Sequence, residues 1–296
     1  MGKKYTILIW IAAFFWGCIG LFTICFAEVG FTTTELCLLR TLITTICLIP
    51  YFLIRNPKVL KLQRFSDIKY FIGTGIFSFA FFNWCYLETI QETSLGVAAI
   101  LLYTAPAIVM IFSVFLFKES FTKRKIMILF ATFIGCVLVT GINPGGAGIS
   151  FKGMILGLGS GIGYALYSIF GKYALEKYSS MTIVVYTFLF SSIPFLFMVS
   201  PLDLVKKMNA TGYWEFGMVF ALVSVIIPYM SYTKALSYVK ASKASLIATL
   251  EPVVAALIGI FVLSESAQFS KIVGMILVVG AVCLMSMEEK RGNNEE

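Results

Sequence analysis

Histidine is absent from the 296-residue sequence, and charged residues are few. Charged side chains make up 13% of the residues, roughly half of their share in an average soluble domain. The lack of histidine removes the commonest transition-metal ligand and the commonest general base of enzymes. No nucleophile–base pair or cluster of metal ligands replaces it. We therefore expect no enzyme activity, no metal site and no cofactor.

Two other kinds of functional motif are lacking. The seven cysteines lie in apolar runs and form no C-x-x-C pair, so we interpret them as small hydrophobic residues. The glycine-rich run "GLGSGIG" at 157–163 lies inside a predicted membrane span and fails the register of a dinucleotide-binding loop. ATP is therefore not expected to be the direct energy source.

Apolar runs dominate the sequence instead. Hydrophobic residues make up 59% of the chain, and the mean hydropathy is +0.92. Runs of 18 or more apolar residues recur, and a bilayer core needs roughly 20 per helix. The first run is longer than the core of a signal peptide, so we interpret it as an uncleaved span. The fold class is an all-α polytopic membrane protein, with ten predicted spans at 5–26, 34–54, 69–88, 94–117, 124–142, 152–175, 180–199, 213–236, 242–263 and 270–287.

The positive charges predict the orientation of these spans. The net charge of +8 sits in short loops, where it indicates topology rather than nucleic-acid binding. With the N-terminus in the cytoplasm, eighteen of the 23 Lys and Arg residues lie on the cytoplasmic side and four lie outside, while Arg40 falls within a span. We therefore expect a multi-pass protein of the cytoplasmic membrane with both termini in the cytoplasm.

The two halves of the sequence are similar at a constant offset. The run "LLYTAPAIVMIFSVFLFKES" in the fourth span matches "IATLEPVVAALIGIFVLSES" in the ninth. An offset of 146 residues pairs Gly17 with Gly163, Tyr86 with Tyr232, Pro106 with Pro252, Glu119 with Glu265 and Lys125 with Lys271. We expect two five-helix repeats, at 1–146 and 147–296. Because five is odd, the second repeat is inverted in the membrane, as in many secondary transporters.

The same runs resemble the paired signatures of the EamA family in the drug/metabolite transporter superfamily. "FFWG" in the first span and "SYTKALSYVKASKASLIATLEP" before the ninth are also similar to that family. The resemblance implies a ten-helix transporter with a central cavity between two five-helix halves. It also implies transport of amino acids or other small metabolites, mostly by export, although some relatives import.

Glu251 is the one acidic residue that the sequence predicts near the middle of the membrane. It lies eight residues after Lys243, roughly 12 Å along a helix axis. A carboxylate at that depth must be protonated, paired or hydrated. We expect a structural role, a role in coupling transport to protons, or a contact with the cargo. Pro106 and Pro252 interrupt their spans and are candidate hinges.

Polar and aromatic residues deep in the spans are candidates for substrate binding. Arg40 lies six residues into the second span, where it would hold an anionic group or anchor the helix. Tyr164 and Tyr167 are also deep but are not included in the candidate set. The predicted substrate-binding residues are Trp16, Arg40, Asn83, Trp84, Tyr86, Tyr103 and Tyr232.

We thus expect a monomeric secondary transporter that exports small metabolites such as amino acids by alternating access. The sequence leaves open whether protons drive it. The alternatives are a passive small-solute channel and a metabolite importer.

Overall fold

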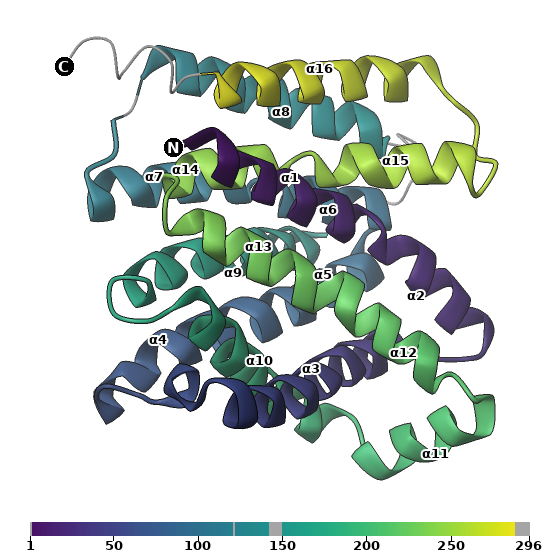
Figure 1. Ribbon diagram of the computed structural model, residues 1–296. Helices are drawn as coiled ribbons and strands as arrows, with labels where there is room; N and C mark the ends of the chain where they lie inside the picture. The colour runs from purple at the N-terminus through teal and green to yellow at the C-terminus, as the bar shows by residue number, and fades with distance from the viewer. Residues whose placement is uncertain (1, 121, 142–149, 288–296) are drawn as a thin grey trace.

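The computed structural model describes residues 2–120, 122–141 and 150–287, and every regular element in these ranges is a helix. Figure 1 shows the helices packed side by side in one bundle. The elements of the first half are α1 (Gly2–Gly17), α2 (Ile19–Glu28), α3 (Thr33–Arg55), η1 (Pro57–Leu60), η2 (Phe65–Asp67), α4 (Ile68–Ile72), η3 (Gly73–Ala80), α5 (Phe81–Glu92), α6 (Leu95–Leu102), α7 (Ala105–Phe117) and α8 (Lys123–Thr140). Those of the second half are α9 (Phe151–Ala174), α10 (Ser180–Met198), α11 (Pro201–Thr211), α12 (Trp214–Ala221), η4 (Leu222–Ile226), α13 (Ile227–Leu236), α14 (Ala241–Ala248), α15 (Glu251–Phe261) and α16 (Phe269–Ser286).

The all-α polytopic fold predicted from hydropathy is confirmed. Within the described ranges, nine helical segments are long and apolar enough to cross a membrane. The predicted span not among these nine is the fifth, 124–142, which corresponds to α8; its first turn carries Lys123, Arg124 and Lys125 before an apolar stretch. The predicted boundary between the repeats, at residues 146 and 147, lies outside the described residues.

Apart from the short 3-10 helices η1 and η2, α11 is the one helix in the described ranges that lies outside the ten predicted spans. Ser200 accepts a hydrogen bond from the Asp203 amide and thereby caps α11, and Pro201 occupies its first turn. Leu204 and Met208, four residues apart on this helix, are both buried. Helix α11 is therefore a short amphipathic helix, and it projects from one end of the bundle (Figure 1).

Corresponding spans of the two halves are interrupted at corresponding places. The fourth span consists of α6 and α7, and the ninth consists of α14 and α15. Pro106 and Pro252 lie in the first turns of α7 and α15, where the missing amide hydrogen costs little. The third and eighth spans each contain a π-helical segment, η3 and η4, a form that frequently occurs at functional sites.

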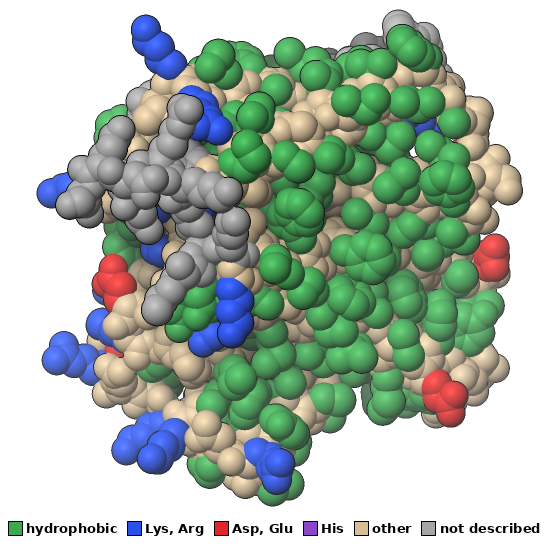
Figure 2. Space-filling view, turned by 45° about the horizontal axis from the view of Figure 1, so that its top comes forward, with side chains coloured by type: hydrophobic (Ala, Val, Ile, Leu, Met, Phe, Trp, Pro, Cys, Tyr) green, Lys and Arg blue, Asp and Glu red, His purple; other side chains and the backbone are tan. Residues whose placement is uncertain are grey.

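The two ends of the bundle differ in charge. We call the end that carries the start of α1 and residues 118–120, 175–179 and 237–240 the basic end, and the opposite end the α11 end. In Figure 2 most of the visible Lys and Arg side chains gather at the left, where the basic end lies, and hydrophobic side chains cover the middle. At the basic end Lys177 donates a 2.8 Å hydrogen bond to Asp67, which raises the pKa of that lysine.

Helices α8 and α16 lie side by side along one edge of the bundle (Figure 1). Gly135 of α8 and Gly274 of α16 permit this close approach. A Cβ atom on Gly274 would lie 2.7 Å from the Gly135 carbonyl oxygen, and one on Gly135 would lie 2.9 Å from the Gly274 carbonyl oxygen. Small residues at such crossings let membrane helices pack backbone to backbone.

We predict that Gly274→Ala destabilises the protein by about 1–3 kcal/mol, because the added methyl group must push the two backbones apart. Gly280→Ala on the same helix is the matched control, since a Cβ atom there meets nothing within 4 Å. Thermal unfolding of both variants in the same detergent measures the difference. Equal melting temperatures would contradict the packing described here.

Candidate functional site

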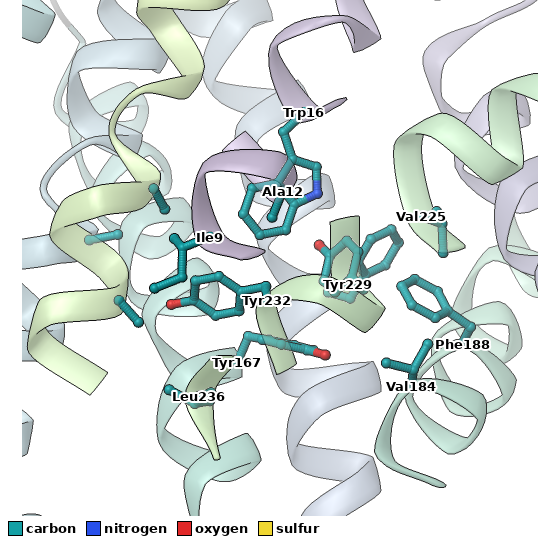
Figure 3. Packing of buried hydrophobic residues seen from close by; sticks show 14 of the residues in the cluster. Ile9, Ala12, Trp16, Tyr167, Val184, Phe188, Val225, Tyr229, Tyr232 and Leu236 are labelled. Carbon is teal, nitrogen blue, oxygen red and sulfur yellow. The ribbon is translucent and has the colours of Figure 1, made fainter. Parts of the chain in front are cut away.

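An aromatic cluster occupies the middle of the bundle, between α1, α9 and α13 (Figure 3). The ring centroid of Trp16 lies 5.2 Å from that of Tyr229 and 5.4 Å from that of Tyr232, and Tyr167 lies 5.0 Å from Tyr229. Most of these contacts are edge-on or tilted, as aromatic rings prefer. These rings, with those of Phe82 and Tyr164, surround a cavity of about 10 Å³, which we call the aromatic cavity.

Hydroxyl groups fix the rings of this cluster. The Tyr167 hydroxyl lies 2.6 Å from Thr233 Oγ1, and the Tyr232 hydroxyl lies 2.7 Å from Ser168 Oγ. Both bonds join α9 to α13, and all four side chains are buried. Because a buried hydroxyl without a partner is costly, these bonds hold the two helices in register.

A second small cavity lies next to the first and contains Glu251. Its volume is about 10 Å³, and Tyr103, Pro106, Thr249 and Glu251 are among its lining residues. We call it the carboxylate cavity. Tyr164 lines both cavities, and in the second it lies beside Glu251. The aromatic rings and the carboxylate thus form one continuous site with Tyr164 at its centre.

The interruption of the ninth span determines where Glu251 lies. The break after Ala248 makes Glu251 the first residue of α15, at the positive end of the helix dipole. Gly17 of α1 packs against this turn, since a Cβ atom there would lie 2.9 Å from the Glu251 carbonyl oxygen. Ala105 is the corresponding first residue of α7, so only the second half places a carboxylate at its break.

Arg40 and Asn83 form a separate polar pair. Arg40 Nη2 donates a 2.7 Å hydrogen bond to Asn83 Oδ1 and lies 3.4 Å from Cys37 Sγ. The guanidinium also stacks 5.0 Å from the centroid of Phe79, whose ring contacts Tyr229 at 5.7 Å. Among the described residues no carboxylate forms an ion pair with Arg40, and its Nε atom has no hydrogen-bond partner.

An outer groove of about 750 Å³ opens at the α11 end. The start of α3, the end of α5 and the end of α10 line it, and Trp84, which is 40% exposed, lies on its wall. Asn83 precedes Trp84 on α5 but is buried, so the Arg40–Asn83 pair lies deeper than the groove.

The structure brings together only part of the predicted site. Trp16, Tyr232, Tyr103 and Glu251 line the two central cavities. Arg40 and Asn83 contact each other instead, Trp84 lines the outer groove, and Tyr86 is not among the lining residues of either central cavity. Pro106 lines the carboxylate cavity, and Pro252 directly follows Glu251.

Tyr164, Tyr167 and Tyr229 were missing from the predicted set. The sequence holds a signal for them, because Tyr164 with Tyr167 and Tyr229 with Tyr232 are three residues apart, a spacing that places side chains on one helix face. In the described part of the chain, no group of three or more Cys, Asp and Glu residues is arranged to hold a metal ion.

These features define a class: a polytopic helical membrane protein whose two similar halves meet at a small polar and aromatic centre. Comparison with known families identifies the family within this class. The model of the EamA-like transporter family matches the chain twice, over residues 3–141 and 151–287. The chain belongs to this family of transporters.

Individual relatives are distant. The chain is 26% identical to the uncharacterized transporter YdfC of Bacillus subtilis over 265 residues, covering 89% of this chain and 85% of the relative. It is 25% identical to the threonine/homoserine exporter RhtA of Salmonella typhimurium over 248 residues, covering 82% and 78%. A solved crystal structure superposes with a TM-score of 0.76 at 17% identity, over 98% of this chain and 99% of the other, which supports the fold alone.

We predict that Asn83→Ala destabilises the protein by about 1.5–3 kcal/mol, because it removes the side-chain oxygen that accepts from a buried guanidinium. Asn83→Asp retains an acceptor oxygen and is expected to fold at least as stably as Asn83→Ala. Asn209→Ala, at an exposed asparagine that also accepts a hydrogen bond, is the control and should cost less. Chemical or thermal unfolding in detergent compares the three, and equal losses for Asn83→Ala and Asn209→Ala would contradict the prediction.

Proposed function

We propose that this protein is a secondary transporter that exports small metabolites such as amino acids by alternating access. It lies in the cytoplasmic membrane, and its basic end faces the cytoplasm. The bias of Lys and Arg toward that end supports the orientation. Small size and a complete ten-helix bundle favour a monomer.

The small volume of the two central cavities is the observation that most supports this proposal. Each of the two central cavities has a volume of about 10 Å³, close to the minimum that one water molecule needs. The outer groove, by contrast, has a volume of about 750 Å³. A passive channel needs a continuous wet path, and a centre this narrow favours a carrier that must change conformation to let a solute through.

The chemistry of the centre favours a solute with an ammonium group. Trp16, Tyr229 and Tyr232 present aromatic rings, which attract cations, and Glu251 supplies a carboxylate. Arg40 lies outside both central cavities, and its Nε hydrogen has no partner among the described residues, so it would meet a substrate carboxylate only after a change of conformation. Together these groups suit an amino acid, and the similarity to an exporter of threonine and homoserine supports the same class of cargo.

Two further roles for Glu251 fit the same position. Its carboxylate lies at the positive end of α15 and lines the same cavity as Tyr164, which suits a structural role. It would also bind a proton when no cargo is present, which is a coupling role. Pro106 and Pro252 lie where the broken fourth and ninth spans would bend.

Counterflow in proteoliposomes tests the proposed function. Vesicles are loaded with unlabelled threonine, and uptake of external labelled threonine is followed without any ion gradient; parallel vesicles carry homoserine, leucine and lysine. A carrier accumulates label transiently above equilibrium and saturates with concentration. Uptake that never exceeds equilibrium and rises linearly with every solute would instead identify a channel.

The Glu251→Gln variant separates its three roles. If the carboxylate couples transport to protons, the variant loses flux driven by a pH gradient but keeps counterflow. If it binds the substrate ammonium group, counterflow is lost as well, while the melting temperature is kept. A structural role predicts a lowered melting temperature. Glu215→Gln, at an exposed acid outside the site, is the control and should change none of these.

A further inference from the structure

At the basic end of the bundle, Glu119 binds the start of another helix. Its Oε1 atom accepts a 3.0 Å hydrogen bond from the Ala241 amide, and its Oε2 atom accepts from the Ser242 hydroxyl. Glu119 is 8% exposed. Helix α14 has no side-chain cap of its own, because Lys240 occupies the capping position. The end of the fourth span therefore caps the start of the ninth, with a carboxylate at the positive end of a helix.

A buried lysine completes this contact. Lys125 Nζ lies 3.8 Å from the Glu119 carboxylate and donates hydrogen bonds to Ser242 Oγ at 3.3 Å and to the Ser120 carbonyl at 3.0 Å. It is 3% exposed. Glu119, Lys125 and Ser242 thus form one buried polar network that links the two halves of the chain.

The helix end before Glu119 has a counterpart with the same backbone conformation in the second half, 146 residues later. Lys118 and Ser264 are the two non-glycine residues with positive φ in the described chain, at 52° and 57°. The Glu119 amide donates to the Ser113 carbonyl at 3.1 Å, and the Glu265 amide donates to the Gly259 carbonyl at 2.9 Å. Each of these pairs is related by the offset of the repeat, so both helix ends present a glutamate in the same way.

The two glutamates nevertheless have different partners. The side chain of Glu265 is 49% exposed and pairs with Lys271 at 2.8 Å. By the repeat, the segment that corresponds to Ala241 and Ser242 is Leu95 and Gly96, at the start of α6. Leu95 is 63% exposed, and within the described residues the side chain of the capping Ser94 accepts a hydrogen bond from the Val97 amide alone. The contact is therefore made at the basic end and not at the α11 end.

We propose that Glu119 and Glu265 are paired positioning residues that close the two ends of the transporter in turn. In the opposite state Glu119 leaves the start of α14, and Glu265 accepts hydrogen bonds from the amides at the start of α6. This inference rests on the proposed alternating access. Each state makes one carboxylate–helix contact and exposes the other glutamate, which keeps the two states close in free energy. The lysine partners Lys125 and Lys271 stay with their own glutamates in both states.

Hydrogen exchange of the full-length protein in lipid nanodiscs tests the inference, followed by mass spectrometry of peptides from α6 and α14. Glu119→Gln weakens a charge-assisted bond and should speed exchange at 241–248 by about tenfold while slowing exchange at 95–102. Glu265→Gln should shift both segments in the opposite directions. The double variant should return the ratio of the two rates close to that of the wild type, because both states lose the same contact.

Glu176→Gln, at an exposed acid of the basic end, is the control and should leave both segments unchanged. A purely structural cap would speed exchange at 241–248 in Glu119→Gln without slowing 95–102, and that result would overturn the inference. So would equal responses to Glu119→Gln and Glu265→Gln. Counterflow by the wild type is measured in parallel, so that a failed inference with intact counterflow leaves the transport function standing.

Discussion

The breaks in the fourth and ninth spans are the constraint on which the rest of the site depends. A continuous helix would satisfy its own backbone groups, whereas an interrupted helix in a membrane must find partners for the groups that it frees. Pro106 and Pro252 sit where their missing amide hydrogens cost least. The break in the ninth span also creates a helix start at the centre of the protein, and this start is where Glu251 is tolerated.

The two halves share backbone features but differ in the side chains that they place at corresponding positions. Helix breaks, π-helical segments and the turns before Glu119 and Glu265 all recur in both halves. The chemistry does not recur, because Ala105 stands where the second half has Glu251, and Glu119 is buried while Glu265 is exposed. Shared backbone features give the two halves similar conformations, and the unshared side chains give each half its own part of the site.

Much of the fold could be predicted from the sequence, because a membrane imposes simple rules on length and charge. Apolar runs predicted the spans, and the offset of 146 predicted the matching breaks at Pro106 and Pro252. The site was harder to predict. Depth along a helix can be read from a sequence, but rotation about the helix axis cannot, so Trp84 shares a predicted set with Trp16 although it lines the outer groove. Amphipathic α11 is too short and too polar for hydropathy to reveal, and Tyr229 was hidden among packing aromatics.

In the proposed transport cycle, the two ends of the bundle open in alternation. Double electron–electron resonance on a cysteine-free background in nanodiscs tests it most directly, with spin labels at Lys118 and Lys240 for the basic end and at Ser94 and Ser264 for the α11 end. These two pairs are related by the repeat, and all four residues are exposed. We expect a mainly short distance in the first pair and a mainly long distance in the second, each with a minor population at the other distance. Saturating threonine should change the ratio of the short to the long population in opposite directions in the two pairs. A single fixed distance in each pair, or two pairs that lengthen together, would contradict this alternation.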